Sequence, residues 1–365
     1  MINRTMLTFL PFLMISLCCR AQSDDPEFLS VKTYELKVKT LPPASLQFPF
    51  KSIKIIDSRF DTSKIGFLFS HRFFKDFYRP YRLIKLKNGL QTNIEKFLND
   101  YYQHNFINNN HSLLIVIKKL WMTNVSSNAL EQTNEFGPDF LNEYVYAKFE
   151  YYAEVDNRYI PLKRIDTLFQ NSSNVRSVDY DYKEESSLPF LCFSLENMIE
   201  NMNYKDYFDF LTNKRSYTLS EIMDRNLTEK NIPVLKEQLR TGVYLTFEEF
   251  KKNQPAITVF TKNKIAKERT YELFDGNKNK LLHYFACFDG SQLEMPFPLA
   301  LLVPGKTSQV NPVARRVGNT FEFYEIIGNR NAGTKYLPNS HILILSDKNL
   351  SMVPRQIDME SGAIY

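Results

Sequence analysis

Glycine, cysteine and tryptophan are scarce in this 365-residue sequence, which contains eleven, four and one of them. Four cysteines are too few for a small fold built on disulfides, and the low glycine content excludes a fibrous repeat. It also argues against a glycine-rich phosphate loop, and no P-loop, dinucleotide fingerprint or nucleophile elbow is present. A hydrophobic content of 43% and a net charge of only +5 exclude a disordered chain. The length instead predicts about two domains, each with its own core.

Long hydrophobic runs are also missing, apart from one stretch near the N-terminus. Arg4 precedes the apolar residues 6–17, and the small residues Cys19 and Ala21 precede Gln22. This is the order of a secretory signal peptide, so we expect cleavage between Ala21 and Gln22. The stretch is shorter than the roughly 20 apolar residues that cross a bilayer. We therefore expect no transmembrane helix in the mature chain.

Lipidation at Cys18 or Cys19 is the alternative to simple cleavage. Residues 23–25 (Ser-Asp-Asp) resemble the acidic tether that follows the lipid anchor of some surface lipoproteins. Leu17 or Cys18, however, stands where such proteins carry Gly, Ala or Ser before the anchor. Both alternatives predict an exported protein that is periplasmic, associated with the outer membrane, secreted or lipid-anchored.

The first half of the mature sequence reads as strands around one main helix. Apolar residues recur at helical spacing from Leu90 to Tyr101 and predict a helix over 90–102. Residues 144–155 alternate strictly, with Lys148 and Glu150 on the polar face of the expected strand. Residues 159–169 are expected to return as its hairpin partner.

The second half begins after a stretch rich in Ser and Asn, residues 170–187, which we interpret as a linker. A helix is expected after Leu188, and Thr218 and Thr246 each begin a capping-box pattern. Short β-rich runs with Asp-Gly turns follow from residue 257.

These patterns predict an α+β protein. Its N-terminal part is expected to be a small α/β sandwich, an antiparallel or mixed sheet with one main helix. Its C-terminal part is expected to be a β-rich meander or partial barrel. The predicted divisions are a signal peptide (1–21), an N-terminal α+β domain (27–169), a polar linker and helical connector (170–240) and a C-terminal β-rich domain (241–365).

Basic charge is concentrated in residues 51–87, where ten basic side chains face three acidic ones, a net charge of +7. Five aromatic residues are interleaved between positions 73 and 81. An exported protein meets anionic lipid head groups and acidic glycans rather than nucleic acid, so the segment is a candidate anionic-surface site. The alternative is that the aromatics pack inward while the basic groups remain hydrated. The candidate binding residues are Arg59, Arg72, Lys75, Arg79 and Arg82.

Cys192 and Cys287 are the two cysteines that remain after cleavage, and an oxidising compartment permits a disulfide between them. Each lies in an apolar pattern, which favours two buried thiols. The five histidines show no metal-ligand spacing, so we expect no metal and no cofactor.

Two segments resemble known bacterial proteins. Asp57-Ser58-Arg59 at a strand end, Lys64-Ile65-Gly66 and the following helix and strand make residues 51–123 similar to YajG-type bacterial envelope lipoproteins. This resemblance implies a small α+β sandwich and an envelope location, with no established activity. Residues 240–325 resemble uncharacterised secreted envelope proteins. That likeness rests on the runs 242–250, 253–255, 289–290 and 316–323.

An export signal, two predicted domains and the lack of a catalytic signature favour a non-catalytic envelope accessory or binding protein. The expected partners are an anionic envelope lipid, a glycan or another envelope protein, without nucleic acid. A secreted hydrolase with a dispersed active site, acting on glycans, is the alternative. A concave pocket with convergent carboxylates, or with Ser and His in hydrogen-bond reach, would favour the hydrolase.

Overall fold

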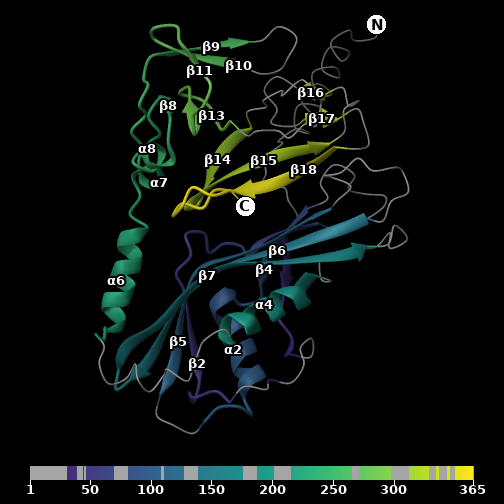
Figure 1. Ribbon diagram of the computed structural model, residues 1–365, viewed down its shortest axis with the longest axis vertical. Coiled ribbons are helices and arrows are strands. Elements are labelled where there is room, and N and C mark those ends of the chain that lie inside the picture. The colour runs from purple at the N-terminus through teal and green to yellow at the C-terminus, as the bar shows by residue number, and fades with distance from the viewer. Residues whose placement is uncertain are drawn as a thin grey trace, which may run out of the picture.

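The architecture is that of a computed structural model, in which helices and β-sheets are combined as the sequence predicts for an α+β protein (Figure 1). It describes residues 31–38, 44, 47–69, 81–107, 111–126, 139–175, 187–200, 215–264, 271–296, 312–328, 334–336, 343–345 and 350–364.

The N-terminal half forms a mixed, seven-stranded sheet with the order β1-β4-β3-β5-β6-β7, in which β2 also pairs with β5. Three long antiparallel strands of 15, 17 and 18 residues form its body. The strands are β1 (Val31–Tyr34), β2 (Ile53–Asp57), β3 (Gly66–Phe69), β4 (Tyr81–Leu86), β5 (Ser112–Ser126), β6 (Asp139–Val155) and β7 (Arg158–Val175).

Two strands share one edge of β5. The first, β2, pairs in parallel with Leu113–Ile117, and β3 pairs in parallel with Met122 and Thr123. Between them the chain leaves the edge as the loop 58–65, opposite an irregularity in the β5–β6 register between Ile117 and Lys119. The sheet therefore has a gap in its strand pairing at the middle of β5.

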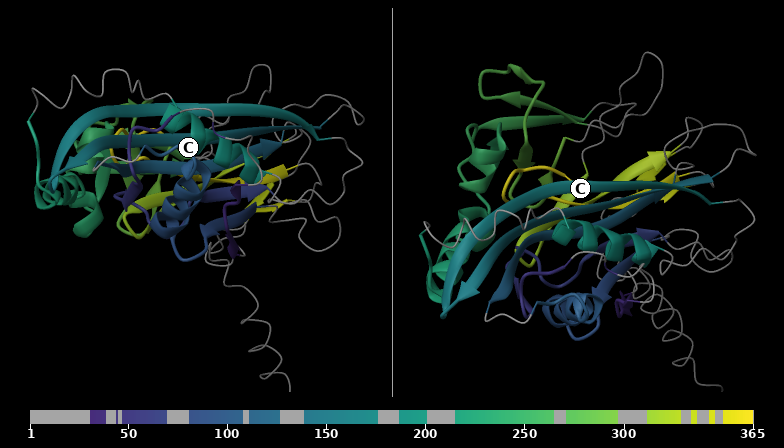
Figure 2. Two further views of the ribbon diagram at one scale, coloured as in Figure 1. Left: turned by 90° about the horizontal axis from the view of Figure 1, so that it is seen from below. Right: turned by 60° about the horizontal axis from the view of Figure 1, so that its bottom comes forward.

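Helices α2 (Leu90–Tyr102) and α4 (Leu188–Glu200) cover one face of this sheet (Figures 1 and 2). The apolar stripe of α2 is buried, and it packs with α4 and with the inward residues of β5 and β6 in one continuous core. The strict alternation of β6 explains its position, because every second side chain enters that core. Val145, Phe149 and Tyr151 are fully buried there.

The C-terminal half contains a six-stranded antiparallel sheet, a three-stranded sheet and a two-stranded sheet. The larger sheet has the order β18-β15-β14-β13-β12-β8, and the three-stranded sheet has the order β11-β10-β9. The strands are β8 (Gly242–Tyr244), β9 (Phe260–Lys264), β10 (Tyr271–Asp275), β11 (Lys280–Leu281), β12 (Ala286–Phe288), β13 (Leu293–Glu294), β14 (Val313–Val317), β15 (Thr320–Gly328), β16 (Thr334–Tyr336), β17 (Leu343–Leu345) and β18 (Leu350–Gln356).

Helix α6 (Leu219–Glu229) leads from the N-terminal half to the C-terminal half, where α7 (Pro233–Lys236) and α8 (Phe247–Lys251) follow. Thr218 and Glu221 form a complete capping box on α6, as predicted, and Thr246 caps α8 by accepting a hydrogen bond from the Glu249 amide. A second core begins at Ile232 and gathers residues of α7, α8 and the larger sheet.

Two expected boundaries differ from the structure. Strand β7 continues to Val175, so residues 170–175 are paired with β6 and are not part of a linker. Their polar composition suggested a linker, but the hydrogen bonds that pair β7 with β6 are made by the backbone and do not require apolar side chains. Asn171 adds a side-chain hydrogen bond of 2.8 Å to Glu143. Helix α4 is likewise part of the N-terminal core, where Leu191, Leu195 and Ile199 are buried, rather than part of a connector.

Candidate functional site

The polar face of the N-terminal sheet is covered by other parts of the chain. Helix α6, strand β15 and residues 356–361 lie against the loop 58–65 and the outward side chains of β5–β7. We call this contact the seam. In Figure 1 it lies between the sheet that contains β5–β7 and the sheet that contains β15 and β18.

Arg59 closes the gap in the strand pairing of β5. Its guanidinium donates to the Lys64 carbonyl at 2.6 Å and to the Leu120 carbonyl at 3.3 Å. It also forms a two-pronged pair with the Asp57 carboxylate, with both distances 2.9 Å. The side chain thus satisfies backbone carbonyls that have no strand partner there, which is the condition for burying them.

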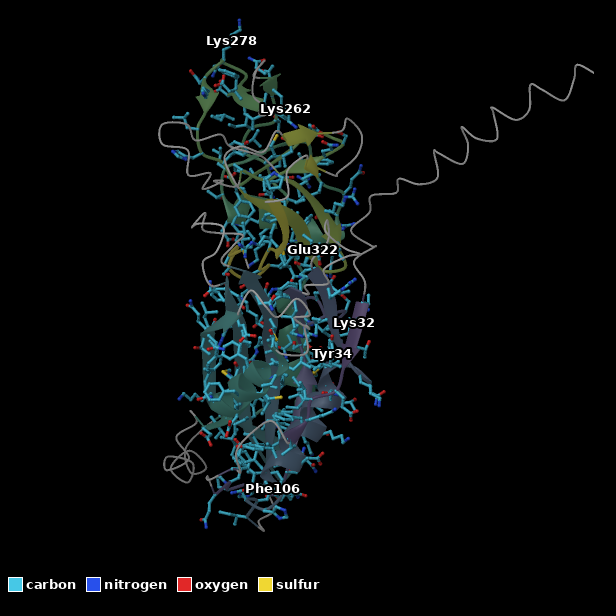
Figure 3. The ribbon with its side chains drawn as sticks, turned by 90° about the vertical axis from the view of Figure 1, so that its right-hand side faces the viewer. Lys32, Tyr34, Phe106, Lys262, Lys278 and Glu322 are labelled. Atoms are coloured by element: carbon cyan, nitrogen blue, oxygen red, sulfur yellow. The ribbon has the colours of Figure 1, made fainter. Side chains whose placement is uncertain are left out.

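Lys64 links the loop 58–65 to the C-terminal sheet through an ion pair. Its ammonium lies 3.1 Å from Asp61 and also contacts the Glu322 carboxylate of β15, although only 3% of the lysine side chain is exposed. Figure 3 shows Glu322 at the junction of the two halves. Burial raises the pKa of Glu322, against the opposing effect of Lys64. Phe60 reinforces the contact by packing against the second core.

The C-terminal segment forms a second set of ion pairs with the face of the N-terminal sheet. Asp358 accepts from the Lys119 ammonium at 2.9 Å, and Glu360 contacts both Lys148 and Arg164, the latter at 3.0 Å. Burial alone would raise the pKa of Asp358, but Lys119 and nearby hydrogen bonds hold it below its ordinary value. The segment is therefore fixed by charge as well as by packing.

Helix α6 supplies the third set. Lys118 donates to the Asn226 carboxamide oxygen at 2.6 Å and also contacts the Glu229 carboxylate. One turn earlier, Arg225 contacts the buried Glu150 of β6 and donates to the Tyr152 hydroxyl at 2.7 Å. These pairs join residues more than 70 positions apart in the sequence.

A small cavity lies inside the seam. It is lined by the loop 58–65, by residues 118–121 of β5 and by residues 356–359, and its volume is about 30 Å³. A water needs roughly 10–15 Å³ by this measure, so the space holds about two waters and no organic substrate. Its charged walls are already paired with one another, as described for Arg59, Lys119 and Asp358.

A separate polar cluster lies in the C-terminal half. Lys262 of β9 donates to Asp289 at 2.6 Å and to Glu294 at 3.0 Å, and so ties the three-stranded sheet to the β12–β13 hairpin. Burial raises the pKa of Glu294 and raises that of the neighbouring Cys287 thiol to about 12. Figure 3 shows Lys262 far from Glu322. The thiol stays protonated at neutral pH and is not poised as a nucleophile.

The candidate anionic-surface residues do not form one exposed patch. Arg59 is 4% exposed and fully engaged inside the protein, so its assignment to that surface was wrong. The sequence could not reveal this, because its partners depend on the gap in β5. Arg82 is half-buried on β4, and Arg72, Lys75 and Arg79 lie outside the described residues.

Cys192 and Cys287 are both buried and do not form a disulfide. Cys192 lies on α4 in the N-terminal core, whereas Cys287 lies on β12 with Val243 and Leu273. The structure therefore agrees with the prediction of two buried thiols rather than a disulfide. The expected cleavage site at Ala21 and Gln22 lies outside the described residues.

Among the described residues, no three His, Cys, Asp or Glu side chains gather as metal ligands would. No helix in the described part of the chain is both long and apolar enough to cross a membrane.

The fold and the seam together define an α+β protein whose two halves are joined by buried ion pairs. No family model matches the chain, and no curated protein matches it. The crystal structure of protein XCC0632 from Xanthomonas campestris, assigned to family-model DUF330, is similar over 47% of this chain and 90% of that chain. The identity is 10% and the TM-score is 0.24, so this likeness carries no argument about function.

Proposed function

We propose that the chain is a non-catalytic, exported envelope accessory or binding protein. The signal-like N-terminus supports export, and the similarity of residues 51–123 to YajG-type lipoproteins supports an envelope location. The proposed partner is an anionic envelope lipid, a glycan or another envelope protein.

The proposal that the protein is non-catalytic rests mainly on the pairing of its buried charges. Lys64, Lys119 and Lys148 each contact a carboxylate on the other side of the seam. A buried charge that is paired in this way supports the structure, whereas a general acid or base must reach a substrate. The seam cavity is also too small for an organic substrate.

The partner can be tested with the mature chain on liposomes. Replacing Arg72, Lys75 and Arg79 together with Gln removes three charges from the basic segment. Each basic residue near an anionic surface contributes roughly 1 kcal/mol, so we expect the loss of three to weaken binding to phosphatidylglycerol vesicles at low salt by about a hundredfold. The matched control replaces the exposed Lys163, Lys236 and Lys252, and should change binding much less.

The location can be tested by fractionating cells and capturing partners from the envelope fraction with the tagged full-length chain. Recovery in the envelope and a reproducible envelope partner would support the proposal. Recovery of the uncleaved chain in the cytosol, or turnover of glycan substrates by the purified protein, would contradict it.

A further inference from the structure

Helix α6 carries a buried hydrogen-bond donor near its end that has no acceptor among the described residues. Asn226 is 2% exposed, and its carboxamide oxygen accepts from Lys118 at 2.6 Å. Its Nδ2 group is buried and has no hydrogen-bond partner in the described part of the chain. Exchanging the N and O atoms of the Asn226 amide would place its NH₂ group against the Lys118 ammonium, where two donors would meet. The orientation with an unpaired NH₂ group is therefore the better one.

Lys230 adds a cation on the same side of α6. It follows Asn226 by four residues, the spacing that places two side chains one above the other on a helix. Lys230 continues the helical backbone as the C-cap, with φ −83° and ψ −5°. Its side chain is half-buried. Among the described residues its ammonium forms no ion pair, although Asp57 and Glu229 act on it electrostatically. A half-buried cation and a buried orphan donor thus lie one turn apart.

Lys230 lies among other charged side chains of the seam. Burial lowers the pKa of Lys230, and Lys118 and Arg59 lower it further, against Asp57 and Glu229. Both carboxylates are already engaged, Asp57 by Arg59 and Glu229 by Lys118. Lys230 is therefore the cation of this group that has no ion pair with a described carboxylate.

The donor inventory fits an oxyanion. The Lys118 ammonium has three N–H groups, and two of them are directed to Asn226 and Glu229. The third N–H, the Asn226 amide and the Lys230 ammonium remain as donors. The C-terminal end of the α6 dipole opposes an anion, so the Lys230 charge has to outweigh it. A group with several acceptor oxygens satisfies such donors better than chloride does.

We propose that Lys230, Asn226 and Lys118 form a binding site for a phosphate-type oxyanion, either free or as an exposed phosphate ester of a lipid head group. The site adjoins the seam and does not depend on the proposed envelope function. It gives the orphan donor of Asn226 a ligand, as buried polar groups require.

The test uses the full mature chain, with inorganic phosphate as the probe and sodium chloride of equal ionic strength as the reference. Isothermal titration measures the dissociation constant, and the thermal midpoint gives an independent reading. We expect saturable phosphate binding that chloride does not reproduce. A charge-assisted hydrogen bond contributes enough that Lys230→Met should weaken binding about tenfold or more.

Two further variants make the result specific. Asn226→Asp retains an oxygen for Lys118 but replaces the donor with a negative charge, so it should also abolish phosphate binding. Lys236→Met removes an exposed lysine from α7 and should leave the constant within about twofold. If Asn226→Asp fails to fold, Lys230→Met against Lys236→Met decides the question alone.

A vesicle arm separates the two sources of phosphate. Lys230-dependent binding to phosphatidylglycerol vesicles, but not to phosphatidylcholine vesicles, would identify a head group as the ligand even if free phosphate binds poorly. No phosphate binding above chloride together with no Lys230-dependent vesicle binding would overturn the proposal. Binding that both α6 variants leave unchanged would overturn it as well.

Discussion

The substitution Lys64→Met is expected to weaken the ion pairs of the seam most. Methionine keeps much of the length of the lysine side chain and its packing against Phe67, whose ring centre lies 5.5 Å from the ammonium. It removes the one charge that Asp61 and Glu322 share. The substitution therefore isolates the electrostatic contribution of a lysine that is almost fully buried.

The magnitude follows from the two carboxylates that are left behind. Breaking a buried ion pair by removing one partner costs about 3–5 kcal/mol, because the remaining charge is buried without compensation. We expect Lys64→Met to lose this much free energy of unfolding at pH 7. Without Lys64 the pKa of Glu322, already raised by burial, rises further above its unfolded value. The folded variant then binds protons more readily than the unfolded chain, so the loss should shrink as the pH falls toward about 5.

Urea unfolding provides the assay, with Trp121 as the reporter. It is the single tryptophan of the sequence, is 3% exposed, and lines the seam cavity. Glu322→Gln and the double variant complete a mutant cycle with Lys64→Met. We expect a coupling of about 2–3 kcal/mol, because Lys64→Met strands Glu322, whereas Glu322→Gln leaves Lys64 with Asp61 as its partner.

Two results would refute this reasoning. A loss below about 1 kcal/mol for Lys64→Met would mean that the lysine is hydrated and worth no more than a surface pair. Additive effects in the cycle would mean that Lys64 and Glu322 do not interact.

Three further substitutions test other parts of the structure. Asp358→Asn should cost about 1–3 kcal/mol at pH 7. Because its folded pKa is lowered, the stability that Asp358 adds is present above its unfolded value of 3.8. In acid unfolding curves that difference from wild type should shrink as the pH falls below 3.8, and it should be lost once the pH has passed the lower folded pKa. Gly362→Ala should cost about 1–3 kcal/mol in thermal unfolding, because φ is +77° and the new Cβ would lie 2.4 Å from the Phe247 ring. An unchanged midpoint would show that this turn relaxes freely. Asn253→Ala should cost about 2–4 kcal/mol in urea, since the fully buried amide accepts from Tyr244 at 2.9 Å and two backbone groups depend on it. A loss below 1 kcal/mol would contradict that role.

Local patterns predicted the elements with a clear hydrophobic period. Helix α2 has the expected bounds of 90 and 102, and the alternation from Tyr144 to Val155 lies within β6. The capping box at Thr218 is present in full. These features depend on residues at most four positions apart, so the sequence alone is sufficient for them.

The seam could not be predicted because its partners are distant in the chain. Lys148 and Glu150 were correctly placed on the polar face of β6, but that face is buried under Glu360 and Arg225. Alternation identifies two faces of a strand without showing what covers the polar one. Arg59 was misread for the same reason, since a basic residue in a basic segment gives no sign that its acceptors are the backbone carbonyls of Lys64 and Leu120.

Hydrogen–deuterium exchange of the wild type and Lys64→Met tests most directly whether the seam joins the two halves of the molecule. Peptides from β5 and from β15 and β18 should lose protection together in the variant, while α2 and α4, which lie on the opposite face of the N-terminal sheet, should retain theirs (Figure 2). A change confined to the loop 58–65, with β15 and β18 unaffected, would contradict the account.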